Sequence, residues 1–95
     1  MDTTTEPRVR KDETRSRYEL LIDDDVVGVA DFRVQGDRVV MPHTEIAAHL
    51  RGRGLGDVLV AAALDDVRDQ GRTVVPHCWF VAGFIEQHAD YGDLL

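Results

Sequence analysis

The chain has 95 residues, a formal net charge of −7 and a hydrophobic fraction of 43%. This length allows one domain with one modest core, which buries roughly 60% of the surface that the unfolded chain exposes. The acidic charge argues against general nucleic-acid binding, which depends on Lys and Arg to neutralise phosphates. No apolar run reaches the roughly 20 residues of a membrane span, so no membrane partner is expected.

The first fifteen residues are polar, rich in Thr and charge, and without apolar periodicity. We therefore expect a disordered tail over residues 1–15 and one folded domain over residues 16–95. The start of the chain has no signal-peptide features, and the single Cys78 cannot form an internal disulfide. These features predict a cytoplasmic protein.

Three strands are predicted next, at residues 17–23, 26–34 and 38–46. Each segment is rich in apolar and β-branched residues and is bounded by polar turn residues. The turns, Asp24-Asp25 and Gln35-Gly36-Asp37, are short, so the three strands are expected to run antiparallel.

An amphipathic helix is predicted over residues 57–70, and Gly71 is placed to end it. Its apolar positions recur at helical spacing: Leu55, Val58, Leu59, Ala62 and Val67. A fourth strand at residues 72–78 is expected to lie parallel to the third, because a helix connects the two. A second helix follows over residues 80–88. Its aromatic residues, together with the preceding tryptophan, are expected in the core: Trp79, Phe80 and Phe84.

Between the third strand and the first helix, the segment from Leu50 to Gly56 holds three alternating glycines and two arginines. Glycines let a ligand approach the main chain closely, and the following helix points its free N–H groups and positive dipole end at the loop. A phosphate or pyrophosphate is the natural ligand. The spacing fits neither a P-loop nor a dinucleotide-binding fingerprint. An ordinary glycine-rich turn and an RNA-binding patch are the alternatives.

The pattern Arg51-x-x-Gly54-x-Gly56 resembles the Q/R-x-x-G-x-G/A loop with which the GCN5-related N-acetyltransferases bind the pyrophosphate of coenzyme A. With residues 43–45 and 76–81, it is similar to the minimal, stand-alone members of the YjdJ type. The resemblance covers residues 17–95. It implies an α/β fold with a mixed α+β sheet: a minimal acyl-CoA N-acyltransferase core in the order β-β-β-α-β-α, without the family's usual N-terminal helices.

The resemblance further implies an acetyl-CoA-dependent N-acetyltransferase, which moves an acetyl group to a primary amine on a small molecule or a basic protein tail. The residues that it assigns to coenzyme A are Ile46, Arg51, Gly52, Arg53, Gly54, Leu55 and Gly56. By the same resemblance, main-chain N–H near Ile46 is the donor to the oxyanion. The alternatives are a non-catalytic acyl-CoA-binding module and an interaction domain without a cofactor.

Acetyl transfer needs a base for the amine and a proton for the departing thiolate. Glu45 or His43 is the candidate base, against the alternatives of a solvated carboxylate and a histidine bonded to the backbone. Strand alternation places Met41, His43 and Glu45 on one face. Pro42 and Pro76 cannot donate a ladder hydrogen bond, and we expect them near an opening between the third and fourth strands.

Cys78 is a candidate nucleophile, or the acid that protonates the departing coenzyme A, against the alternative of a buried and inert cysteine. A zinc site built from His43, Glu45, His77 and Cys78 is disfavoured, because the spacing matches no familiar ligand pair. The sequence therefore predicts His43, Glu45 and Cys78 as catalytic residues, and no metal.

Overall fold

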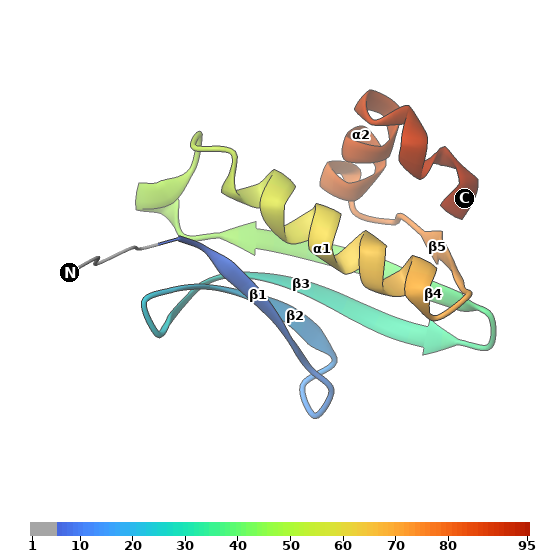
Figure 1. Ribbon diagram of the computed structural model, residues 1–95, viewed down its shortest axis with the longest axis horizontal. Helices are drawn as coiled ribbons and strands as arrows, with labels where there is room; N and C mark the ends of the chain where they lie inside the picture. Colours follow the sequence, from blue (N-terminus) through green and yellow to red (C-terminus); the bar gives the residue numbers. More distant parts are fainter. Residues whose placement is uncertain (1–5) are drawn as a thin grey trace.

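The computed structural model describes residues 6–95 (Figure 1). Its strands and helices have the following bounds: β1 Arg8–Asp12, β2 Arg17–Ile22, β3 Asp25–Gln35, β4 Arg38–Ile46, the 3₁₀ turn η1 Ala48–Leu50, α1 Leu55–Asp69, β5 Thr73–Val75, α2 Trp79–Gln87 and the 3₁₀ segment η2 Ala89–Leu94. None of the helices formed by residues 6–95 has both the length and the hydropathy needed to cross a membrane.

The five strands form one mixed sheet in the order β1-β2-β3-β4-β5. The first four run antiparallel, and β5 is parallel to β4. The prediction of a mixed α+β sheet with a parallel strand after the helical crossover is confirmed. The predicted order lacked one strand, β1, at the outer edge.

Strand β1 shows that the expectation of a disordered tail is wrong for Arg8–Asp12. These residues pair with β2 along their whole length, and Val9 packs against the core. The strand was missed because its other side chains are mostly charged: Arg10, for example, bonds to Glu19 of β2. Residues 1–5 of the expected tail lie outside the described residues.

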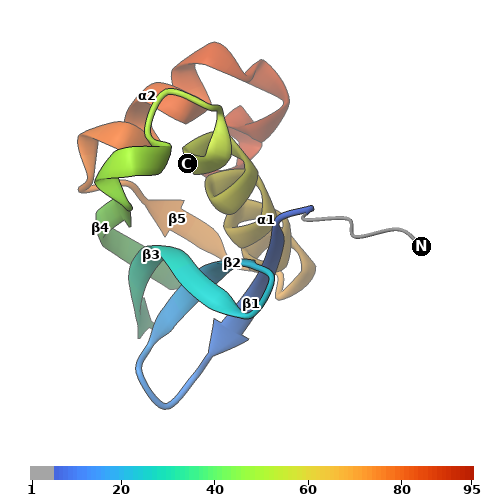
Figure 2. The same cartoon turned by 90° about the vertical axis from the view of Figure 1, so that its left-hand side faces the viewer.

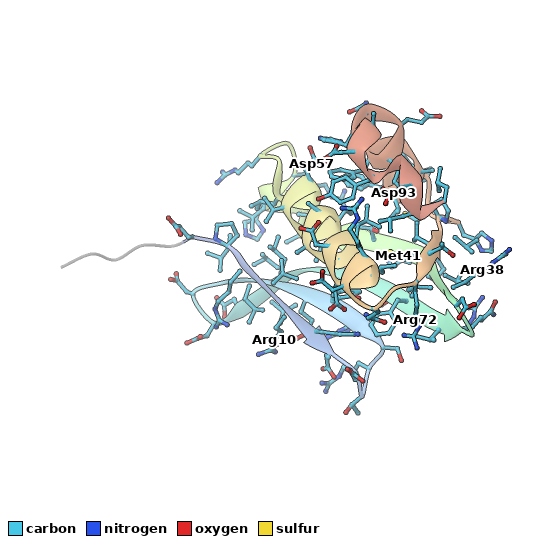
Figure 3. The ribbon with its side chains drawn as sticks, turned by 45° about the vertical axis from the view of Figure 1, so that its right-hand side comes forward. Arg10, Arg38, Met41, Asp57, Arg72 and Asp93 are labelled. Carbon is cyan, nitrogen blue, oxygen red and sulfur yellow. The ribbon has the colours of Figure 1, made fainter. Side chains whose placement is uncertain are left out.

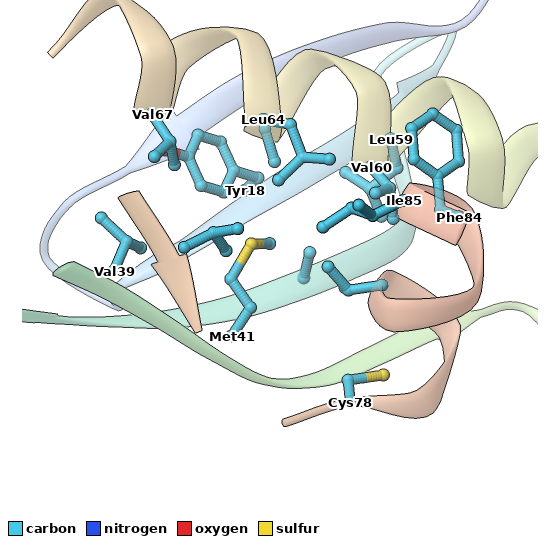
Figure 4. Close-up of a cluster of buried hydrophobic side chains, with 14 of the residues drawn as sticks. Tyr18, Val39, Met41, Leu59, Val60, Leu64, Val67, Cys78, Phe84 and Ile85 are labelled. Atoms are coloured by element: carbon cyan, nitrogen blue, oxygen red, sulfur yellow. The ribbon is translucent and has the colours of Figure 1, made fainter. Parts of the chain in front are cut away.

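Both helices pack on the same face of the sheet and enclose the core (Figures 1 and 2). The buried residues of α1 form one stripe: Leu59, Val60, Ala63, Leu64 and Val67. They meet Val81, Phe84 and Ile85 of α2 over Tyr18, Val39 and Met41 of the sheet (Figure 4). Removing each of the Val, Leu, Ile, Phe and Met side chains among them from water contributes about 1.5–3 kcal/mol to stability. Among the described residues, the opposite face of the sheet carries no helix.

A bulge in β4 changes which of its residues share a face. Asp31 pairs with His43 and Arg33 pairs with Val40, so three steps along β4 match two steps along β3. Met41 therefore faces the helices and is fully buried, whereas His43 and Glu45 are exposed on the opposite face. The prediction that these three side chains share one face is wrong, because strict alternation does not continue through an extra residue.

Strands β4 and β5 separate after three paired residues, which end at Val40↔Val75. Beyond this point Cys78 N still donates to Met41 O at 3.0 Å. From Pro42 to Ile46, however, β4 has no strand partner on that side among the described residues. Pro42 and Pro76 stand where the strands part, as the sequence predicts. We call the stretch from Pro42 to Ile46 the free edge of β4.

Candidate functional site

The free edge of β4 directs main-chain groups outward. Ala47 N donates to Val27 O at 2.8 Å, which makes Gly28↔Ile46 a non-hydrogen-bonded pair of the antiparallel ladder. By alternation, Thr44 and Ile46 then point their N–H and C=O groups away from β3, towards the free edge. Ile46 O accepts a hydrogen bond from Arg51 Nε at 3.1 Å. The N–H groups of Thr44 and Ile46 are therefore placed to bond a ligand.

Two adjoining cavities run along this edge. The larger, of about 550 Å³, is lined by His43, Thr44, Glu45, Ile46, Arg51, Trp79 and Phe80. The smaller, of about 200 Å³, lies at the glycine loop and is lined by Ile46, Leu50, Arg51, Gly52, Gly54, Leu55, Gly56, Asp57 and Phe80. Because the two cavities share Ile46, Arg51 and Phe80, they form one groove, which we call the edge groove.

The polar end of the edge groove holds His43 and Glu45. His43 Nε2 lies 3.0 Å from Glu45 Oε1, and the two side chains are 53% and 61% exposed. Across the ladder, His43 stands opposite Asp31 and Glu45 stands opposite Val29. When Nε2 carries the proton and donates to Glu45, Nδ1 is free to accept a proton. The structure thus brings together the two residues that the sequence predicts as candidate bases.

Cys78, the third predicted catalytic residue, lies behind the wall of the groove. It is buried at 8% exposure, immediately before α2, and is not among the residues that line the larger cavity. Its Sγ lies 3.7 Å from Thr44 Oγ1, and Thr44 does line the cavity. Among residues 6–95, no group of three or more His, Cys, Asp or Glu side chains could hold a metal ion.

The glycines of the loop have different structural roles. Gly52 and Gly54 have φ angles of 82° and 77°, in the left-handed region that favours glycine. Gly54 is also the N-cap of α1, and no side chain caps the first turn, so its N–H groups stay available to an anion. Gly56 is required for packing, because a Cβ there would lie 2.5 Å from Phe80 Cζ.

The charges at the loop are mixed. Arg51 lines both parts of the edge groove, whereas Arg53 lines neither cavity. Asp57 stands in the first turn of α1 and lines the smaller cavity (Figure 3). The other predicted coenzyme A residues all line the groove: Ile46, Arg51, Gly52, Gly54, Leu55 and Gly56.

Three residues of the larger cavity were not predicted: Thr44, Trp79 and Phe80. The expectation that Trp79 lies in the core is wrong, because it is 83% exposed at the start of α2. Phe80 is half-buried, and Phe84 does lie in the core. The sequence carries no local signal for these positions, because they depend on where β5 leaves β4.

The family model of the GCN5-related N-acetyl-transferases matches residues 17–94 of this chain. The chain therefore belongs to this family, as its glycine loop indicated. The assignment to a YjdJ-like subtype stays a prediction.

Among known proteins, the chain is similar to Protein NATD1 of Bos taurus, with 35% identity over 54 residues. The match covers 56% of this chain and 48% of the relative, so the chain spans about half the length of the curated relative it matches. A GCN5-like putative N-acetyltransferase from Staphylococcus aureus has a TM-score of 0.71 at 22% identity, covering 92% of this chain and 85% of that one.

A second solved structure, the ribosomal-protein-S18-alanine N-acetyltransferase from Escherichia coli, has a TM-score of 0.59 at 17% identity. It covers 61% of this chain and 38% of that chain. At these identities, both structures show that the fold is shared.

Proposed function

We propose that this protein is an acetyl-CoA-dependent N-acetyltransferase that acetylates a primary amine. The observation that carries the proposal is the free edge of β4, where the N–H groups of Thr44 and Ile46 border a groove that continues to the uncapped first turn of α1. Membership of the GCN5-related N-acetyl-transferase family also supports this proposal.

The edge groove offers groups that suit the parts of coenzyme A. Its loop end offers the N–H groups of the first turn of α1 and the guanidinium of Arg51, which suit a pyrophosphate. Its middle is a strand edge, which suits the amide groups of an extended arm, because an unpaired edge bonds an added extended segment. Arg53 is close enough in sequence to add charge at the loop mouth.

The acyl group arrives activated as a thioester when acetyl-CoA is bound. In this proposal, the amine nitrogen bonds to the acetyl carbon while His43 receives the proton that the amine loses, and the C–S bond then breaks. The imidazolium of His43 returns this proton to the released coenzyme A thiolate, and Glu45 holds the imidazole through the 3.0 Å contact. The outward N–H groups of Thr44 and Ile46 are the donors to the negative charge that develops on the carbonyl oxygen.

Cys78 is assigned a positioning role. Its thiol supports Thr44 at 3.7 Å from inside the core, and its burial keeps it from a ligand in the cavity. Direct transfer from acetyl-CoA to the amine is therefore favoured over a route through an acetylated cysteine.

The test combines binding and turnover. The protein is incubated with acetyl-CoA and a panel of primary amines, and mass spectrometry measures the N-acetylated amine. We expect product above the uncatalysed rate, and thermal stabilisation by coenzyme A, which amounts to about 2.7 kcal/mol at a ligand concentration 100 times Kd. Stabilisation without product would instead indicate a non-catalytic acyl-CoA-binding module. If neither product nor stabilisation is observed, the protein is instead an interaction domain without a cofactor.

A further inference from the structure

We propose that the acceptor is a primary amine with a compact apolar substituent, and that it binds in a separate cavity bordered by Glu45 and Val29 of the uncovered sheet face. This inference rests on the proposed function. The cavity has a volume of about 240 Å³ and is lined by Val26, Val27, Gly28, Val29, Glu45 and Ala47. We call it the valine cavity.

Access to the reacting end of the edge groove decides where an acceptor can bind. Both helices pack on one face of the sheet, and the proposed cofactor takes the free edge of β4. Among the described residues, the other face of the sheet has no covering helix. An acceptor that does not compete with the cofactor arm therefore reaches His43 and Glu45 across this uncovered face.

The valine cavity adjoins the edge groove through one residue. Glu45 lines both cavities, and its cross-strand neighbour Val29 lines the valine cavity. An amine whose substituent lies in the valine cavity thus has its nitrogen beside Glu45. Glu45 also lines the larger cavity of the edge groove, together with His43. Two separate observations, the shared lining residue and the ladder register, place these groups together.

The lining of the valine cavity selects the chemistry of the acceptor. Its side chains are those of valine and alanine, apart from a single carboxylate, Glu45. The carboxylate complements an ammonium group, and the apolar walls favour an aliphatic or small aromatic substituent. The depression is open to solvent, and its volume of about 240 Å³ suits a compact substituent. A polyamine has further charges that these walls do not pair.

The kinetic test compares amines and two matched valines. The amines are 3-methylbutylamine, ethanolamine and spermidine, and the variants are Val26→Asn and Val34→Asn. Val26 and Val34 both stand on β3 and are 42% and 43% exposed, but Val26 lines the valine cavity and Val34 is outside it.

We expect 3-methylbutylamine to have the highest kcat/KM. Val26→Asn should raise its KM roughly tenfold, consistent with the loss of one to two buried methyl groups, without changing the coenzyme A affinity. Val34→Asn should leave KM unchanged.

The binding test needs no turnover. Amide chemical shifts of the protein alone are followed as 3-methylbutylamine is added. Saturable shifts at Val26, Val29 and Ala47, with none at Val34, would support the valine cavity if the shifts at Val29 and Ala47 are lost in Val26→Asn. A protein that acetylates ethanolamine or spermidine as well as 3-methylbutylamine, with no shifts at these residues, would overturn this inference and leave the proposed function standing. A protein that acetylates no amine would overturn the proposed function, while the shifts still decide whether the cavity binds amines.

Discussion

The contact between His43 and Glu45 orients the imidazole that is proposed as the base of the edge groove. Replacing His43 with Gln keeps a polar side chain of similar length but removes a base. We expect kcat to fall about 100-fold or more, within the usual range for the loss of general-base catalysis. The dissociation constant for coenzyme A should change little, because the substitution leaves the loop and the main-chain groups of the free edge in place.

His49→Gln is the control for this substitution, because His49 is an exposed residue of η1 outside the groove. Its kcat should match that of the unaltered protein. If His43→Gln keeps full activity while Glu45→Gln loses it, Glu45 is the base and the roles assigned to the pair are reversed.

Burial of Cys78 leads to a prediction that separates two chemical routes. Intact-mass measurement after incubation with acetyl-CoA should show no stable acetyl adduct on the protein. Cys78→Ala should retain turnover within about tenfold of the unaltered protein, because it removes support for Thr44 and no reacting group. An acetyl adduct that disappears in Cys78→Ala, together with abolished turnover, would establish the covalent route instead.

The stability of the sheet depends on pH through the ionisation of Glu19. Its side chain is 1% exposed and lies 2.7 Å from Arg10 and 2.8 Å from Arg17. The hydrogen bond from Arg10 lowers the pKa of Glu19 most, burial opposes this, and Arg17 adds to the lowering, so the pKa falls below its ordinary value of 4.5. A lowered pKa in the folded state means that the contribution to stability is complete at neutral pH and is lost as the pH falls through the folded-state pKa.

Glu19→Gln should therefore lower the free energy of unfolding by about 1–3 kcal/mol at pH 7, because two charge-assisted hydrogen bonds are weakened. The difference from the unaltered protein should shrink in acid. Urea denaturation at pH 7 and at pH 3 measures both values. Glu86→Gln, on the exposed side of α2, is the control and should have little effect at either pH. A deficit of equal size at both pH values would contradict the ionic role of Glu19.

At the scale of elements, the turn from η1 into α1 depends on glycine conformation. Gly54 has a φ of 77° and is the N-cap of α1, so a β-branched residue there strains the backbone and blocks the first turn. We expect Gly54→Val to weaken coenzyme A binding at least 100-fold in calorimetric titration.

Gly36→Val is the matched control for Gly54→Val. Gly36 also has a positive φ, of 63°, and open space around it, but it stands in the turn between β3 and β4. Both variants should lose about 1–3 kcal/mol of stability through backbone strain. Only Gly54→Val should lose affinity for coenzyme A. Equal affinities in the two variants would mean that the loop does not contact the cofactor.

The elements that could be predicted from sequence are those with local signals. Polar turns bound β2, β3 and β4, and apolar periodicity marks α1, so these were found within a few residues. β1 could not be found, because half of an edge strand faces solvent and its charges resemble a tail.

The sequence predicts which residues belong to the site better than it predicts how they are arranged. The loop glycines and the pair His43 and Glu45 carry chemistry that is visible in the sequence. The bulge between Val40 and His43 is visible only in the register of two strands, and it places Met41 on the face opposite to His43 and Glu45. The exposure of Trp79 depends on where β5 leaves β4, which is a property of the sheet and has no local signal.

The whole molecule places its two helices on one face of the sheet, leaves one strand edge free and leaves the other sheet face uncovered in the part of the chain that the structure describes (Figure 2). The cofactor and acceptor sites proposed above use the edge and the uncovered face, respectively. They meet at His43 and Glu45. In the proposed arrangement, the two ligands bind on different surfaces and meet at one reacting point.

The most direct test of this account is a titration of the labelled protein with coenzyme A, followed by amide and indole chemical shifts. The account predicts saturable shifts at Thr44 and Ile46 of the free edge, through residues 52–56 of the loop, and at the indole of Trp79, the single tryptophan of the chain. Saturable shifts confined to other surfaces, or no saturable shift at millimolar coenzyme A, would contradict the claim that the free edge of β4 is the cofactor site.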